Sequence, residues 1–241
     1  MTYLIDTHAH LDMYENWEEI YNDAQKKDIK KIIIPSVEEQ FFNKIINISE
    51  KKENLFCMLG IFPSEAKKWN DEIPDIIRTL SKSEKVVAIG EIGLDYYWDK
   101  SLNDLQKEVF IKQIEIANEL NLPIVIHDRE AHKDCFDILK EKNKNSKVLF
   151  HCFSGSPEFA TECIKMGWNI AIGGVVTFKN AIKIKEVAKI IPIENLVLET
   201  DSPYLTPSPY RGKENRPSYI KYVAEEIAKL REMDLSELIK H

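Results

Sequence analysis

The stretch Tyr3-Leu4-Ile5-Asp6-Thr7-His8-Ala9-His10-Leu11-Asp12 is a short apolar run that ends in two histidines. Side chains two residues apart on a strand share a face, so His8 and His10 are expected to point the same way where the strand ends. The turn after them has no glycine-rich phosphate loop, which argues against a dinucleotide-binding sheet. The stretch therefore predicts the first βα unit of an α/β protein, with ligand-type side chains in its first loop.

Seven more short apolar runs follow, and amphipathic segments separate them along the whole chain. Residues 103–120 carry apolar side chains at near-helical spacing, and Ser156 precedes a second helical segment as an N-cap. Eight such units in 241 residues fit one closed barrel of ~250 residues better than two domains. We predict a single (β/α)8 TIM-type barrel over residues 1–241, with an open doubly wound sheet as the alternative. The predicted strands are residues 3–6, 31–35, 56–61, 86–89, 123–126, 148–150, 169–172 and 196–198.

The formal net charge of −7 limits how this chain could bind nucleic acid. Affinity for nucleic acid that is independent of sequence comes from Lys and Arg side chains that neutralise phosphates, and an acidic protein has few to spare. Any contact with a nucleic acid is therefore expected to be local, made by bound cations and a few basic residues at one cleft. Single strands or strand ends are expected to be favoured over long duplexes.

The four cysteines and the hydropathy pattern indicate the compartment. Cys57, Cys135, Cys152 and Cys163 do not form a C-x-x-C pair. The N-terminus lacks the basic and apolar regions of a signal peptide, and no apolar stretch reaches the ~18 residues of a membrane span. We interpret the cysteines as reduced residues of a cytoplasmic protein.

Six side chains able to bind metal ions lie close to the predicted ends of five strands. A lone histidine on an apolar strand is more often a core residue than a ligand, but the carboxyl ends of barrel strands meet at one rim. Burying four imidazoles and two carboxylates together without a cation is costly. Such mixed ligands suit Zn²⁺, Mn²⁺ or Co²⁺ and tolerate Mg²⁺. The residues are His8, His10, Glu91, His127, His151 and Asp201.

Five segments, in order from residue 4 to about residue 230, resemble the TatD family of metal-dependent deoxyribonucleases, a group of amidohydrolase-like barrels. Each motif alone is moderately specific, and their order and spacing together are highly specific. The segments are Ile5-Asp6-Thr7-His8-Ala9-His10-Leu11-Asp12, Ala88-Ile89-Gly90-Glu91-Ile92-Gly93-Leu94-Asp95-Tyr96, Pro123-Ile124-Val125-Ile126-His127, Phe150-His151-Cys152-Phe153-Ser154-Gly155 and Glu199-Thr200-Asp201-Ser202-Pro203-Tyr204-Leu205-Thr206-Pro207, the last followed by Tyr210-Arg211-Gly212-Lys213 and Asn215-Arg216-Pro217.

The resemblance implies two divalent metal ions and a role for each of the six residues. It places one metal on His8, His10, Glu91 and Asp201, and the other on Glu91, His127 and His151, so that Glu91 bridges the two. It implies cleavage of DNA phosphodiester bonds by a two-metal, water-activating mechanism. We expect Asp201 to ligate one metal and also to serve as the general base, which makes Asp201 and Glu91 the catalytic residues.

One motif departs from the family pattern. Relatives usually carry a segment of the form Gly-x-His-Pro-His after the third strand, whereas this chain reads Gly60-Ile61-Phe62-Pro63-Ser64. A phenylalanine cannot donate a proton or hydrogen-bond a phosphate. We therefore expect that Phe62 leaves metal binding intact and that nuclease activity is slower than in relatives that carry the histidine.

Three further residues are candidates for contact with the substrate. Arg129 follows His127 by two residues, and Arg211 lies on the loop after the last strand, where barrels often bind phosphate. Tyr96 begins an aromatic run with Tyr97 and Trp98 that could stack on bases. The alternatives are solvated surface charges for the arginines and a loop anchor for the aromatic run. Three nearby carboxylates, Asp12, Asp95 and Asp128, are candidates for orienting the imidazole ligands, and a helix N-cap is the alternative for Asp12.

Two other functions compete with DNA cleavage. Hydrolysis of a C–N or carboxylic ester bond is one, but amidohydrolase-like relatives often bridge their metals with a carboxylated lysine, and Glu91 occupies that position here. A metal-binding protein without catalysis is the other, and Phe62 gives it some weight. The complete set of ligands favours a hydrolase.

Overall fold

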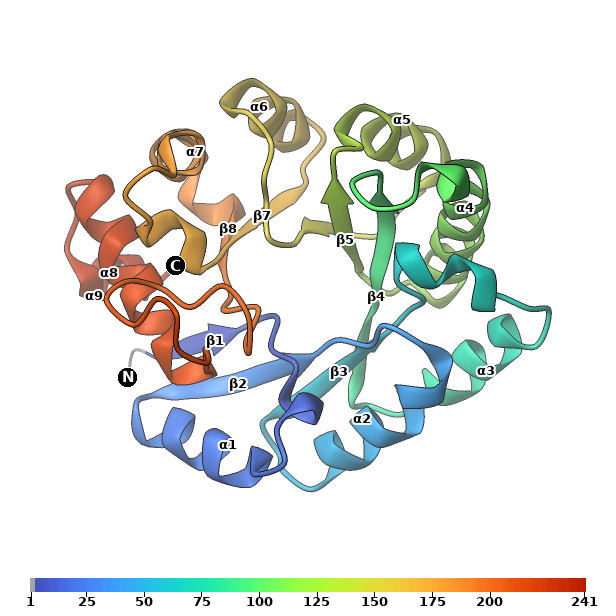
Figure 1. The fold of residues 1–241 in the computed structure, drawn as a ribbon, viewed down its shortest axis with the longest axis horizontal. Helices are drawn as coiled ribbons and strands as arrows, with labels where there is room; N and C mark the ends of the chain where they lie inside the picture. The colour runs from blue at the N-terminus through green and yellow to red at the C-terminus, as the bar shows by residue number, and fades with distance from the viewer. Residues whose placement is uncertain (1–2) are drawn as a thin grey trace. The chain divides into compact units, whose positions relative to one another are not determined.

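The computed structural model describes residues 3–241, and in it eight strands follow one another in the sheet in chain order (Figure 1). Each strand is followed by a helix, and the assigned strand pairs are parallel. The strands are β1 Leu4–Asp6, β2 Ile29–Ile34, β3 Leu55–Leu59, β4 Val86–Asp95, β5 Ile124–Arg129, β6 Val148–Phe150, β7 Asn169–Ile172 and β8 Leu196–Leu198. The helices are α1 Trp17–Lys26, α2 Phe42–Glu50, α3 Ile73–Leu80, α4 Asn103–Leu120, α5 His132–Lys142, α6 Pro157–Lys165, α7 Ile182–Ile190, α8 Ile220–Leu230 and α9 Leu235–Leu238.

Hydrogen bonds join the first strand of this order to the last. The amide and the hydroxyl of Thr7 both donate to the carbonyl of Leu198, at 3.3 and 2.9 Å. Just beyond them, Ala9 and Ser202 form a parallel bridge. The sheet therefore has no free edge at β1 or β8, and the predicted single (β/α)8 TIM-type barrel is confirmed. The open doubly wound sheet is wrong.

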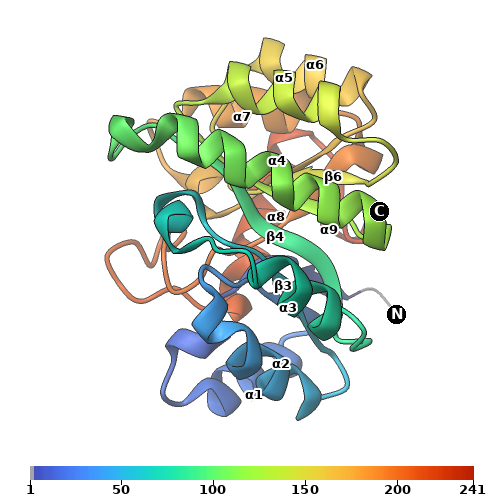
Figure 2. The same ribbon diagram turned by 90° about the vertical axis from the view of Figure 1, so that its right-hand side faces the viewer.

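The chain divides into two compact units, one formed by the residues up to Ile34 with Cys152–His241, the other by Pro35–His151. In the first unit, α8 packs on β1 and β8, and α9 packs on α8. In the second, α4 packs along β4 (Figure 2). The apolar spacing that predicted residues 103–120 as a helix buries Phe110 and Ile114 in that contact.

The fourth and fifth strands are longer than the sequence indicated. The prediction ended β4 at Ile89, where the apolar run ends, but residues 92–95 pair with β5 and extend the strand to Asp95. Gly93 is required there, since its φ is +139° and a Cβ atom would lie 2.1 Å from the carbonyl oxygen of His127. Glu91 and His127 therefore lie within strands, where the ladder fixes their backbone, rather than in loops after them.

The predicted start of α6 is confirmed, and no disulfide joins any of the four cysteines. The Ser156 hydroxyl accepts a hydrogen bond from the amide of Phe159 at 3.2 Å, as an N-cap residue does. Cys57, Cys135 and Cys163 are buried, and Cys152 is half-buried. None of the helices in residues 3–241 combines the length and the apolar character needed to cross a membrane.

Candidate metal centre

Three of the predicted ligands meet in the first unit at the ends of β1 and β8. The Oδ1 atom of Asp201 lies 3.6 Å from Nε2 of His10 and 3.8 Å from Nε2 of His8. Ligand atoms that bind one tetrahedral ion at ~2.0–2.2 Å are about 3.3–3.6 Å apart, so these separations come within a few tenths of an ångström of a metal site. We call His8, His10 and Asp201 the β1–β8 group.

A buried aspartate holds the backbone that carries this group. Asp6 is fully buried, and its carboxylate accepts hydrogen bonds from the amide of His8 at 3.3 Å and from the amide and hydroxyl of Thr200 at 3.0 and 2.5 Å. Burial raises the pKa of Asp6 to about 8, against the lowering effect of these bonds. The amide of Asp201 also donates to the carbonyl of His8 at 2.9 Å. The ends of β1 and β8 are thus fixed to each other beside the ligands.

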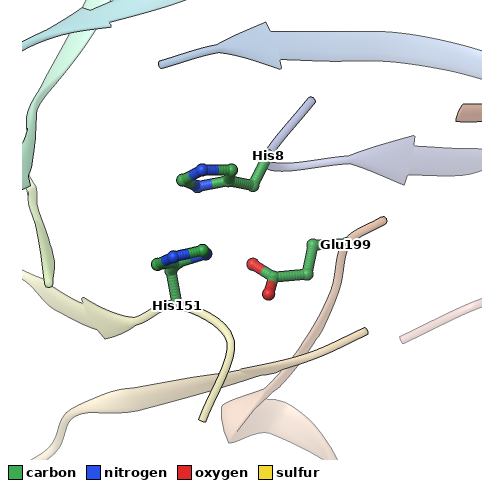
Figure 3. A group of neighbouring side chains, drawn as sticks. All are labelled: His8, His151 and Glu199. Atoms are coloured by element: carbon green, nitrogen blue, oxygen red, sulfur yellow. The ribbon is translucent and has the colours of Figure 1, made fainter. Parts of the chain in front are cut away.

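Glu199 is a carboxylate at this site to which the sequence analysis gave no role. It follows β8 directly, it is fully buried, and its Oε1 accepts a hydrogen bond from the amide of Cys152 at 2.6 Å. In Figure 3 its carboxylate extends into the same region as the ring of His8; His151, also drawn there, belongs to the other unit. Its position two residues before Asp201, directly after a strand, is the signal that could have identified it.

The other three predicted ligands meet in the second unit, on β4, on β5 and after β6. One oxygen of Glu91, Oε2, lies 3.5 Å from Nδ1 of His127 and 3.6 Å from Nε2 of His151. The Glu91 side chain is 4% exposed, so its charge is largely removed from water. We call Glu91, His127 and His151 the β4–β6 group. Each group gathers one carboxylate and two imidazoles whose ligand atoms lie within 4.8 Å of one another, a donor set that fits a divalent cation.

Asp95 orients the ring of His127, as the sequence predicted. Its Oδ2 lies 3.0 Å from Nε2 of His127, which leaves Nδ1 to face Glu91. Burial lowers the pKa of His127, but the hydrogen bonds with Asp95 and Glu91 outweigh it and the net pKa is raised. Burial raises the pKa of Asp95, but the hydrogen bond to His127 lowers it by more. The net pKa of Asp95 is lowered, so that the carboxylate stays ionised. Carboxylates in this position fix the tautomer of a metal-binding imidazole.

Replacing Asp95 by Asn is expected to lower the pKa of His127 in the metal-free protein, because one of the two carboxylates that raise it is lost. At a pH above the pKa of His127 in both the wild type and the variant, the affinity for metal should fall about 10- to 100-fold, the usual effect of removing such a partner. An NMR titration of the histidine rings and a metal titration measure the two effects. Asp128→Asn is the matched control, and an Asp95→Asn variant that behaves like it on both counts would contradict the role of Asp95.

Asp128 is suited as the control because it contacts a histidine outside both groups. Asp128 was expected to orient an imidazole ligand, but its Oδ2 contacts Nδ1 of His132 at 2.8 Å, and His132 begins α5 outside both groups. The side chains of residues 127 and 128 project to opposite sides of β5, because strand residues alternate. Only the first of them faces Glu91.

Phe62, the residue that departs from the family pattern, packs against the candidate ligand His127. Its ring lies edge-on to the imidazole of His127, with 4.5 Å between centroids and 62° between planes. A histidine there would place ring nitrogens beside the β4–β6 group, and Phe62 places carbon there instead. The metal ligands need nothing from this side chain.

The three predicted substrate contacts have different surroundings. Arg129 lies over the ring of Tyr97, 3.8 Å from its centroid, and Arg211 lies over Phe178 at 4.2 Å. Tyr96 donates its hydroxyl to Asp134 on α5 at 2.8 Å, and burial raises its pKa. The hydroxyl of Tyr96 is thus hydrogen-bonded within the protein, whereas the guanidinium groups of Arg129 and Arg211 lie over aromatic rings.

The sequence matches the model of the family described as TatD related DNase over residues 5–241. It is 47% identical to "Uncharacterized metal-dependent hydrolase YabD" of Bacillus subtilis, covering 98% of this chain and 94% of that protein, and 34% identical to YcfH of Escherichia coli K12, a protein with the same description, over 98% and 91%. The crystal structure of YJJV, a TatD homolog from E. coli K12, has a TM-score of 0.92 at 29% identity, with 98% and 93% covered. The chain belongs to the TatD family of metal-dependent hydrolases.

Proposed function

We propose that the chain is a deoxyribonuclease that hydrolyses phosphodiester bonds with two divalent cations, of Mg²⁺, Mn²⁺, Zn²⁺ or Co²⁺. The observation that carries the proposal is the pair of groups, each with one carboxylate and two imidazoles, on or shortly after strands of a (β/α)8 barrel. Active sites of such barrels lie at the carboxyl ends of the strands. The family match supports a nucleic acid as substrate.

We propose that the two groups act on one phosphodiester and that Glu91 is shared between the cations. The support is the barrel fold, which brings carboxyl strand ends to one rim, and the buried Glu91 carboxylate already close to two imidazoles. Bound cations would polarise the phosphate and make water acidic enough to attack near neutral pH.

Asp201 has the position of a proton acceptor in this scheme. Its side chain is 15% exposed, compared with 1% for His8 and 5% for His10, so it is the member of the β1–β8 group that water reaches most easily. A carboxylate within hydrogen-bond reach of the attacking water can take its proton while the imidazoles hold their orientation. Asp201 would thus combine ligation with general-base work.

Metal-free protein should not cleave single-stranded DNA, and adding back Mn²⁺, Mg²⁺, Zn²⁺ or Co²⁺ should restore cleavage. Asp201→Asn should lower the restored rate by at least the ~10²–10⁴-fold typical of losing one acid–base group. The assay compares an end-labelled DNA strand with RNA, a simple phosphodiester, a phosphomonoester, a carboxylic ester and an amide. Hydrolysis of the ester or amide without hydrolysis of any phosphodiester would overturn the proposal.

A second candidate is a phosphodiester or other ester with an apolar leaving group. Phe62 favours it, since its ring lies beside His127 where a polar contact would suit a charged or hydroxyl leaving group. The substrate panel separates the two, because this candidate predicts faster hydrolysis of the simple aryl phosphodiester than of DNA.

A further inference from the structure

Two large aromatic side chains between β4 and α4 are exposed to solvent. Trp98 is 69% exposed and Tyr97 is 47% exposed, and their rings meet edge to face with 4.8 Å between centroids. The neighbouring Tyr96 is held by its hydrogen bond to Asp134, so the aromatic run divides into one anchored ring and two exposed ones. Neighbouring exposed rings form an apolar patch of the kind that marks a binding surface.

An arginine completes this patch. The guanidinium carbon of Arg129 lies 3.8 Å from the centroid of Tyr97 and 5.5 Å from that of Trp98. Among residues 3–241 its guanidinium forms no ion pair and no hydrogen bond. Arg78, by contrast, is bound by Asp75 and Glu119. Arg129 therefore presents all its donors beside two aromatic faces.

The patch is connected to the β4–β6 group by short contacts. The amide of Tyr97 donates to Oδ1 of Asp95 at 3.0 Å, and Oδ2 of the same carboxylate orients His127. Arg129 and His127 lie two residues apart on β5, about 7 Å at the rise of a strand, and on the same face. A ligand with a phosphate at the metal group would reach the patch within about one nucleotide.

We propose that Tyr97, Trp98 and Arg129 form a stacking platform for a nucleobase of a single-stranded nucleic acid. The exposed ring of Trp98 supplies a face that any base can stack on, and Arg129, which lies over Tyr97, supplies donors for the phosphate next to that base. Bases within a duplex are already stacked on each other, so the platform selects single strands and frayed ends. The proposal rests on the proposed function, and it names the part of that substrate that the protein grips.

The test compares a single-stranded oligonucleotide with an abasic strand of the same length, which keeps the phosphates and lacks the bases. Trp98→Ala should raise KM for the normal strand about 5- to 100-fold, the range for losing one stacked base, with little change in kcat. Its KM for the abasic strand should not change, and Trp98→Phe should restore most of the affinity. Tyr3→Ala is the control, because Tyr3 is 43% exposed and precedes β1, at the far end of that strand from its ligands.

Equilibrium binding of the same two strands to Asp201→Asn protein gives a readout that needs no catalysis. Base-dependent binding lost in Trp98→Ala and regained in Trp98→Phe is the expected result. A Trp98→Ala variant that cleaves and binds the normal strand like the wild type would overturn the platform while leaving the nuclease intact. Wild-type protein that binds both strands alike would overturn it too, whereas failure to cleave any phosphodiester contradicts the proposed function itself.

Discussion

Glu91→Gln is expected to lower the metal content of the reconstituted protein from about two ions per chain to less than one, and to reduce phosphodiester cleavage more than about 100-fold. One oxygen of Glu91 lies within 3.6 Å of ring nitrogens of both His127 and His151, and removing a ligand should cost at least as much as removing a partner that orients one. The amide keeps the shape of the side chain, removes its charge and replaces one acceptor oxygen by an NH2 donor. Elemental analysis after gel filtration measures the content, and a single-turnover assay measures cleavage.

Glu141→Gln is the matched control for this change. Its side chain is 71% exposed and lies on α5, outside both groups, so neither the metal content nor the rate should move. A Glu91→Gln protein that retains the wild-type metal content would show that Glu91 does not link the two ions. A lowered metal content with an unchanged rate of cleavage would show that the reaction does not depend on the lost metal.

Phe62→His is expected to raise cleavage of DNA, by up to the ~10²–10⁴-fold that one positioned acid–base group supplies. The new ring would lie beside His127, where its nitrogens could donate to a phosphate or a leaving oxygen. Metal content should stay the same, because Phe62 contacts a ligand without being one. The measurement is kcat/KM on a single strand, with metal content checked in the same preparation.

Phe62→Leu separates the effect of a polar ring from that of disturbed packing. It keeps the position apolar, so it should not raise the rate. If Phe62→His leaves DNA cleavage flat while the wild type hydrolyses a non-nucleic-acid ester efficiently, the nuclease reading is wrong and the metal-dependent hydrolase remains. Equal gains in both variants would show that the effect is one of packing.

The barrel and the strand positions of the six candidate ligands could be predicted from the sequence because both depend on local order. Alternating apolar runs and helical segments define βα units, and a side chain such as His151, directly after an apolar run, must lie at the carboxyl end of its strand. The spacing of His8 and His10 also fixes their common face without knowledge of the fold. These features need no information about distant contacts.

Other features depended on contacts that no local pattern contains. The length of β4 is set by its pairing with β5. Gly93 allows the two strands to come close to each other there, although a glycine is equally typical of a turn. The hydrogen bond that Glu199 accepts from the amide of Cys152 joins residues 47 positions apart, although the place of Glu199 directly after β8 is itself visible in the sequence. The different surroundings of Tyr96 and Trp98 depend on where α5 lies, and so could not be read from a run of three aromatic residues.

The most direct test of the two-metal centre is the anomalous diffraction of crystals soaked with Mn²⁺. Two peaks about 3.5–4 Å apart are expected, one at His8, His10 and Asp201, the other at His127 and His151, with the carboxylate of Glu91 between them. Peaks at one group alone, or two peaks too far apart to share Glu91, would contradict the account.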